Sequence, residues 1–165
     1  MITGNSPYFA PGLKVDGLPP PSPLSHTVQR TVRFEEVDSL GMVWHGHYPS
    51  YFEDARVALG DAYGVGYMDL LNAKIITPVK QMGIDYMIPL RFPQKCRITA
   101  TLHWTDAAKI NLSYMIHDCS GALLTTGYTV QLFIAADQTL CMVKPDFYQN
   151  FCQLWENGRL PSPAL

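Results

Sequence analysis

The feature that most constrains the fold is a series of four segments in which apolar residues recur at every second position. They are residues 82–88, 96–104, 110–116 and 124–134. A period of two is typical of strands, because successive side chains point to opposite faces of a sheet. Only the short turns TDAAK and DCSG separate the last three segments, and short turns join antiparallel neighbours. The sequence therefore predicts an antiparallel sheet in the second half of the chain.

A single long helix is predicted before these strands, over residues 49–63. Pro49 suits the first helical position and Gly64 suits the stop. Between them apolar and small residues recur at helical spacing, namely Tyr51, Phe52, Ala55, Ala58, Leu59, Ala62 and Tyr63. The alanines in this set would let a sheet approach closely. The segment is therefore predicted to be a core helix.

The remaining elements flank this unit. Residues 28–34 alternate as a strand does, and Pro145 opens a short terminal helix that carries Phe147, Phe151 and Trp155. The predicted order is strand, long helix, four strands, short helix, which is an α+β arrangement with one buried helix against a curved sheet. Such a sheet leaves an edge strand unpaired. We therefore expect association of identical copies, as a homodimer or a homotetramer.

Prolines concentrate ahead of this domain, at Pro7, Pro11, Pro19, Pro20, Pro21 and Pro23. Such a segment builds neither helix nor sheet. Residues 1–26 are predicted to be an extended or flexible arm, residues 27–157 the domain, and residues 158–165 a C-terminal tail. Because the arm has little apolar surface to bury, its removal is expected to leave stability unchanged.

Composition excludes several classes of function. The net charge of −2 comes without any run of Lys or Arg, which argues against nucleic-acid binding. There is no apolar run near the roughly 18 residues that span a bilayer, so membrane insertion is not expected. No secretory signal is visible, and the four cysteines show no CxxC spacing, so we expect a cytoplasmic protein with reduced thiols and no zinc.

Chemistry is expected in the stretch FEEVDSLGMVWHGHYPSYFEDAR, residues 34–56. Asp38 lies in an apolar-flanked loop just before His45, His47 and a helix start. A carboxylate there is either the working group of an active site or a residue that braces a turn with Gly41. For an Asp and a Gly at this spacing taken alone, the turn is the better prediction.

This stretch resembles the signature of the hotdog-fold acyl-CoA thioesterases, above all the 4-hydroxybenzoyl-CoA thioesterase-like enzymes and those associated with the Tol-Pal system. The residues that stand close to the pattern are Asp38, Gly41, Val43, His45, Tyr48, Phe52, Glu53, Ala55 and Arg56. The resemblance spans about residues 27–155 and implies a hotdog fold, in which a curved antiparallel sheet wraps around a long central helix. It also implies that Asp38 is the catalytic carboxylate, that a backbone amide near His45 polarises the thioester carbonyl, and that the His45 side chain belongs to the site.

The residues themselves can supply this chemistry. Asp38 can act as a general base on water or as a direct nucleophile, and the sequence does not separate these roles. The helix start after His45 offers N–H groups and a dipole that attract the developing oxyanion. Apolar neighbours are expected to desolvate the carboxylate, namely Val37, Leu40, Met42, Val43 and Trp44. Substrate-binding positions are expected at Gly41, Val43, Trp44 and Tyr48.

Coenzyme A would bring phosphates that favour Lys or Arg at the rim of the pocket. Lys109, after the turn TDAAK, loosely resembles a basic position of related enzymes. Lys95 and Arg97 are further candidates, and all three can equally be solvated residues of strand ends. His45 and His47 lack a third ligand at a usable spacing, so neither a metal nor another cofactor is expected.

Three functions compete. The first is hydrolysis of an acyl-CoA or acyl-carrier-protein thioester, whose acyl group the sequence leaves open. The second is a hotdog module that binds an acyl thioester without cleaving it, although such a module needs no carboxylate like Asp38. The third is a hotdog dehydratase or hydratase, which would use an acid within the helix such as Glu53.

Overall fold

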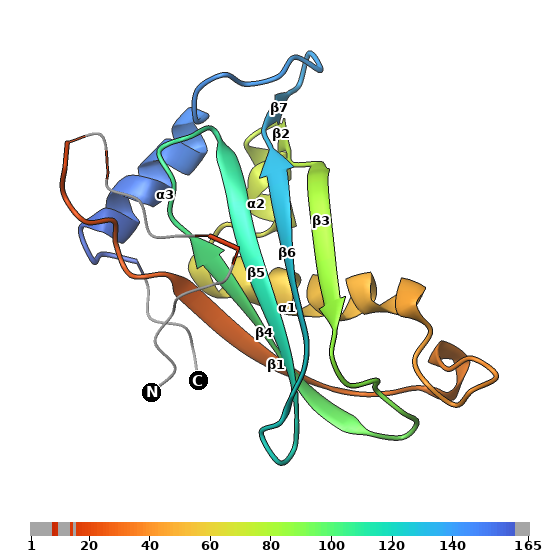
Figure 1. The fold of residues 1–165 in the computed structure, drawn as a ribbon. Coiled ribbons are helices and arrows are strands. Elements are labelled where there is room, and N and C mark those ends of the chain that lie inside the picture. The colour runs from red at the N-terminus through yellow and green to blue at the C-terminus, as the bar shows by residue number, and fades with distance from the viewer. Residues whose placement is uncertain (1–7, 10–13, 15, 161–165) are drawn as a thin grey trace.

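The chain forms a five-stranded antiparallel sheet with a long helix packed across one face, as a computed structural model shows (Figure 1). The structure describes residues 8, 9, 14 and 16–160. The sheet is ordered β1-β4-β5-β6-β3. Its strands are β1 (Leu24–Thr31), β3 (Val79–Tyr86), β4 (Lys95–His103), β5 (Lys109–Asp118) and β6 (Leu123–Leu132). The predicted α+β arrangement and its antiparallel pairing are confirmed.

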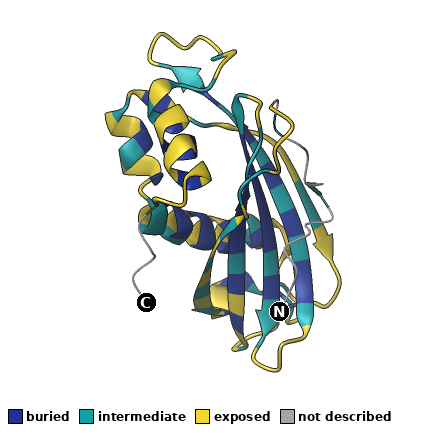
Figure 2. Ribbon diagram, turned by 90° about the vertical axis from the view of Figure 1, so that its left-hand side faces the viewer, coloured by how far each residue is buried: buried dark blue, intermediate teal, exposed yellow. Residues whose placement is uncertain are grey.

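Helix α1 (Tyr48–Tyr63) is the predicted core helix. It begins one residue before Pro49 and ends at Gly64, whose φ of 71° lies in the left-handed region that favours glycine. Its inner face is fully covered by the sheet, with Tyr51 and Ala55 both 0% exposed. Figure 2 shows this buried face turned towards the strands. Each large apolar side chain covered in this way contributes about 1.5–3 kcal/mol to stability.

The smaller elements surround this unit. Helix α3 (Asp146–Glu156) is the predicted terminal helix, and its Phe151 and Trp155 are buried. Helix α2 (Tyr67–Asn72) and the two-stranded sheet of β2 (Ile75–Ile76) and β7 (Ile134–Ala135) were not predicted. Two 3-10 helices, η1 (Phe34–Glu36) and η2 (His45–His47), enclose the loop that contains Asp38. In the described part of the chain, none of the helices is long and apolar enough to cross a membrane.

The boundary of the domain differs from the expected one. Strand β1 starts at Leu24, three residues before the predicted domain start at Thr27, and it ends at Thr31, so that Phe34 lies in η1 instead of in the strand. The indole N–H of Trp155 also donates to the Ser22 carbonyl oxygen at 2.9 Å. Pairing with β4 and packing on α3 therefore extend the ordered unit into the proline-rich segment.

The described residues of the arm contact the domain. The Tyr8 hydroxyl lies 2.7 Å from the Thr126 hydroxyl, and the Tyr8 ring packs on Tyr128 with 4.8 Å between centroids. Lys14 pairs with Glu156 at 2.8 Å. Figure 1 shows the short red segment of residues 8 and 9 in front of the sheet, on the face opposite α1. The other arm residues up to residue 15, and residues 161–165 of the predicted tail, lie outside the described residues.

Candidate active site

The Asp38 loop is closed by its own backbone. The Asp38 N–H donates to the Met42 carbonyl oxygen at 2.8 Å, and the Gly41 N–H donates to the Asp38 carbonyl oxygen at 3.0 Å. Gly41 has a φ of 71°, which a residue with a side chain adopts only at a cost. The Leu40 N–H also donates to the Asp38 carboxylate oxygen Oδ1 at 2.8 Å. Asp38 therefore does brace a turn with Gly41 through its backbone, and the bond from Leu40 uses one of its two carboxylate oxygens.

The same residue lines a cavity. This cavity has a volume of about 220 Å³ and lies between the loop, the start of α1 and the end of β3. Its lining residues are Asp38, Met42, Val43, His45, Tyr48, Tyr86 and Pro89. The structure thus brings together four of the expected catalytic and substrate-binding residues, Asp38, Val43, His45 and Tyr48, and adds Met42, which was expected as an apolar neighbour of Asp38.

The start of α1 borders this cavity. The 3-10 turn η2 runs directly into the helix, with the His47 N–H donating to the Trp44 carbonyl oxygen at 2.9 Å. The first N–H groups of a helix lack partners within it, and the helix dipole places partial positive charge there. The arrangement therefore sets a carboxylate and an electropositive helix start around one cavity.

Two tyrosines, one from the start of α1 and one from the end of β3, line the cavity with aromatic surface. The rings of Tyr48 and Tyr86 meet edge to face, with 4.9 Å between centroids. The Tyr48 hydroxyl oxygen accepts from the Leu90 N–H at 3.2 Å, and the Tyr86 hydroxyl donates to the His45 carbonyl oxygen at 3.0 Å. Burial raises the pKa of Tyr48, so its hydroxyl stays protonated at neutral pH. Tyr86 was not among the expected site residues, although the alternation of residues 82–88 places it on the helix-facing side.

The apolar cover expected for Asp38 is incomplete in a single chain. Val43 is buried and Met42 is half-buried, but Leu40 and Trp44 are 69% and 47% exposed. The Trp44 ring does not line the cavity. It packs against the rings of His45 and His47, with centroid distances of 4.9 and 5.5 Å.

Lys109 lies far from Asp38 within one chain. It begins β5 and pairs with Leu132 at one end of β6, whereas Tyr86 of the cavity pairs with Thr125 near the other end. Seven residues of strand separate these positions along β6, which corresponds to roughly 20 Å. A substrate-binding role for Lys109 stays a prediction, and within a single chain Lys109 does not adjoin the cavity.

Glu53 and Arg56 face a different part of the molecule. Arg56 donates to the Gln131 side-chain oxygen at 2.7 Å and lies 3.6 Å from the Glu53 carboxylate. The Tyr67 hydroxyl also donates to Glu53. Glu53 is thus paired beside α2 and does not line the cavity of Asp38, which disfavours its use as the acid of a dehydratase.

Metal binding has no support around the two histidines. In residues 8, 9, 14 and 16–160 there is no group of three or more His, Cys, Asp or Glu side chains that could hold a metal ion. The rings of His45 and His47 instead pack on Trp44.

Comparison with known proteins supports a family assignment. The Thioesterase-like superfamily matches residues 32–151. A 1,4-dihydroxy-2-naphthoyl-CoA hydrolase of Thermosynechococcus vestitus is 26% identical over 133 residues, which cover 76% of this chain and 80% of that protein. YneP of Bacillus subtilis is 28% identical over 92 residues, which cover 56% of this chain and 67% of YneP.

A solved structure shows the same fold. The DHNA-CoA thioesterase of Staphylococcus aureus superimposes with a TM-score of 0.70 at 24% identity, covering 85% of this chain and 99% of the other. The chain therefore belongs to the Thioesterase-like superfamily, and its curved sheet around α1 is the hotdog fold. It is an enzyme of the thioester hydrolase class.

Proposed function

We propose that this enzyme hydrolyses an acyl-CoA thioester in the cavity that Asp38 and His45 line. The observation that carries the proposal is the position of one carboxylate and one helix start around the same cavity. The T. vestitus relative is named for a CoA thioester substrate, which supports coenzyme A as the carrier. An acyl-carrier-protein thioester would present the same reactive group, so it remains the alternative carrier.

The chemistry follows from the roles of these groups. Asp38 takes a proton from water, whose oxygen attacks the thioester carbonyl carbon, or the carboxylate attacks that carbon itself and water cleaves the resulting anhydride. The carbonyl oxygen becomes negative and is stabilised by N–H groups at the start of the helix near His45. In both routes the tetrahedral intermediate collapses by breaking the C–S bond, and in the second route this happens before water cleaves the anhydride. The leaving thiolate takes up the proton that Asp38 removed from water, or a proton from solvent in the second route, and a free acid remains.

The cavity also suggests how an acyl group is held. Tyr48 and Tyr86 present aromatic surface beside Val43, Met42 and Pro89. Aromatic faces offer an acyl group a large apolar contact area. The wall suits a flat aromatic acyl group as well as an aliphatic one, and assays have to decide between them.

We also propose that two copies associate along β3. This edge strand exposes apolar side chains, with Val79 50%, Met82 38% and Tyr86 49% exposed. Exposed apolar edges are a liability that pairing removes. Because Tyr86 belongs both to this edge and to the cavity, a second copy would complete the apolar cover over the site. Further association into a tetramer stays open.

The decisive experiment is a panel of acyl-CoAs with aromatic, short-chain and long-chain acyl groups, assayed by release of free thiol. We expect hydrolysis of at least one member by the wild-type protein and its loss in Asp38→Asn. Binding of every member without thiol release would favour a non-catalytic acyl-thioester-binding module. Hydration of an enoyl-CoA without thiol release would favour a hydratase function and contradict the proposal.

A further inference from the structure

A buried acidic residue lies two positions before Asp38. Glu36 is the last residue of η1 and is 4% exposed. Removing a carboxylate from water is costly unless the charge is paired and hydrogen-bonded. A buried carboxylate so close to the proposed catalytic residue therefore requires a physical reason, and the sequence pattern alone does not supply one.

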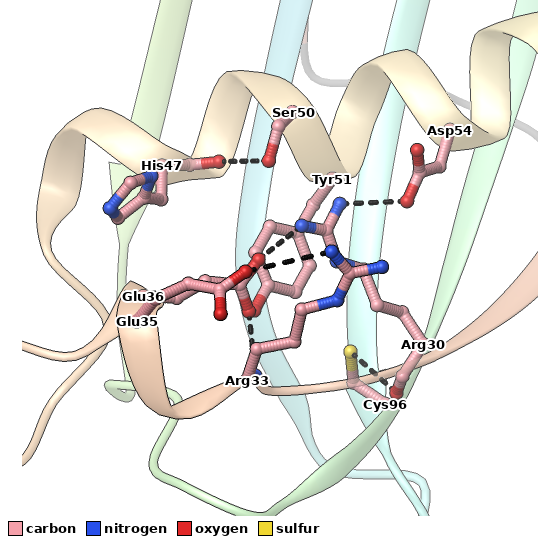
Figure 3. A network of polar contacts seen from close by, with 9 residues as sticks. All are labelled: Arg30, Arg33, Glu35, Glu36, His47, Ser50, Tyr51, Asp54 and Cys96. Carbon is pink, nitrogen blue, oxygen red and sulfur yellow. Dashed lines mark hydrogen bonds and ion pairs between the residues drawn. The ribbon is translucent and has the colours of Figure 1, made fainter.

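The carboxylate of Glu36 is fully engaged by three elements (Figure 3). Arg30 of β1 forms a salt bridge with it. The Tyr51 hydroxyl of α1 donates to its Oε2 at 2.7 Å, and the Arg33 N–H donates to the same oxygen at 2.8 Å. The Arg30 guanidinium also lies 3.9 Å from the centre of the Tyr51 ring, which adds a cation–π contact. Glu36 thus ties the first strand to the second turn of the central helix.

The charge state of Glu36 fits a structural anion. Burial alone would raise its pKa, but the hydrogen bonds from the Arg33 N–H, Tyr51 and Arg30 outweigh burial and hold the pKa below its ordinary value. The side chain is therefore ionised at neutral pH and does not exchange protons there. A group of this kind can hold neighbours in place but is unsuited to act as the general base.

The backbone of Glu36 closes the base of the Asp38 loop. The Trp44 N–H donates to the Glu36 carbonyl oxygen at 2.9 Å. Nearer the tip of the loop, Val37 and Val43 form an antiparallel bridge. One residue further along on each side, the Asp38 N–H donates to the Met42 carbonyl oxygen. The same residue that is anchored by its side chain to β1 and α1 therefore also determines where the two ends of the loop meet.

We propose that Glu36 is a positioning residue, whose carboxylate, held by Arg30 and Tyr51, sets the Asp38 loop against the start of α1. This inference rests on the proposed function of the cavity. The reacting groups come from opposite sides of the loop, with Asp38 before the turn and the N–H groups near His45 after it. A displacement of about 1 Å between such groups can cost on the order of 10² in rate.

The test compares Glu36→Gln with wild type in kcat, KM and amide exchange. Loss of the charge leaves Arg30 without its buried counter-charge, with only the exposed Asp54 carboxylate at 2.7 Å still paired to it, and loosens the loop. We expect kcat to fall about 10- to 100-fold with a much smaller change in KM, because contacts with the bound substrate remain. Amides of Asp38 and Trp44 should exchange faster with solvent.

A matched pair of tyrosine variants distinguishes the positioning role of Glu36 from a general loss of stability. Tyr51→Phe removes one buried hydroxyl that bonds Glu36, and Tyr114→Phe removes a buried hydroxyl that lies 3.1 Å from the Thr129 hydroxyl in the core. We expect kcat to fall in Tyr51→Phe and to be unchanged in Tyr114→Phe. If Glu36→Gln fails to fold, this pair alone carries the test.

The outcomes separate the two proposals. Wild-type turnover in Glu36→Gln, or equal losses of kcat in the two tyrosine variants, overturns the positioning role while leaving the thioesterase proposal intact. A wild-type protein that releases no thiol from any CoA thioester overturns the proposed function, and the positioning role falls with it.

Discussion

At the scale of single residues, Asp38 combines two tasks in one side chain. Its Oδ1 accepts the Leu40 N–H within the turn, and the residue also lines the cavity. Asp38→Asn keeps an oxygen for the turn but removes the basic lone pair. We expect thiol release to fall by about 10²- to 10⁴-fold or more, which is what general-base catalysis is typically worth. The thermal midpoint and the affinity for a non-hydrolysable acyl-CoA analogue should change little. Wild-type turnover would show that Asp38 is only a turn residue.

His45 provides the counterpart to that variant. Its carbonyl oxygen accepts from Tyr86, and the amides at this position belong to the backbone. His45→Ala keeps both groups, so we expect a smaller loss of kcat than in Asp38→Asn if the amide stabilises the oxyanion. Parallel assays on the same substrate give the comparison. An equal or greater loss in His45→Ala would assign the chemistry to the imidazole ring instead.

The cavity residues that lie close together in the sequence were predictable from it. Asp38, Val43, His45 and Tyr48 come from one short stretch, so its local pattern places them together. Tyr86 reaches the cavity only through the register of β3 against β6, and Glu36 is recognisable as buried only once Arg30 and Tyr51 are in place. Lys109 was expected near the site but lies far from it within one chain, because the match to a basic position of related enzymes does not reveal at which end of the sheet the residue lies relative to the cavity.

At the scale of elements, periodicity identifies what is long enough to repeat. Helix α1 and the strands after it were predicted, whereas the six-residue α2 and the two-residue strands β2 and β7 are too short to show a period. The predicted strand of residues 28–34 ends early, because the chain turns at Phe34 into η1. Local bonding of Glu36 to the Arg33 N–H favours that turn over a longer strand.

The packing of α1 on β6 depends on one close approach. A Cβ at Gly127 would lie 2.5 Å from the buried Phe52 ring and 2.9 Å from the Gly83 carbonyl oxygen. Gly127→Ala is therefore expected to destabilise the fold by about 1–3 kcal/mol through overpacking. Gly83→Ala is the control, since the three atoms nearest its Cβ all belong to the half-exposed Tyr128 ring, whose displacement would disturb the Tyr8 contact but leave α1 in place. Urea unfolding measures both variants. Equal losses would mean that α1 has room to move.

At the scale of the whole molecule, the exposed edge of β3 points to association. Met82 lies on this edge beside Ile84 and Tyr86. Met82→Lys would place a charge in the proposed contact between two copies. We expect light scattering to give a dimer or larger assembly for the wild-type protein and a smaller species for the variant, with a parallel loss of activity. A fully active wild-type monomer would contradict a cavity completed by a second copy.

A buried histidine that the arm contacts is expected to make the stability of the fold depend on pH. The Phe9 ring packs on His103 with 5.2 Å between centroids, and His103 lies 2.7 Å from the Ser113 hydroxyl while only 7% exposed. Burial lowers the pKa of His103 from 6.5 to about 4. The unfolded chain therefore binds a proton at a pH where the folded chain does not. Neutral His103 therefore contributes about 3 kcal/mol to the free energy of unfolding above about pH 6.5, and this contribution is lost as the pH falls towards about 4.

Two changes should flatten this acid sensitivity. The substitution His103→Gln removes the titrating group. A chain that starts at Pro21 lacks Phe9, so water is expected to reach the His103 ring and to bring the pKa of His103 in the folded chain back towards 6.5. The shortened chain should also melt at a lower temperature at neutral pH, because it loses the contacts of Tyr8 and Lys14. This revises the expectation, drawn from the prolines alone, that the arm is dispensable. The measurement is the thermal midpoint between pH 4 and pH 7.5. The control is His117→Gln, which also removes a histidine whose pKa burial lowers, but a less buried one, so that the two variants differ in how deeply the lost histidine was buried. A pH profile for His103→Gln that matches wild type would show that the acid sensitivity arises elsewhere.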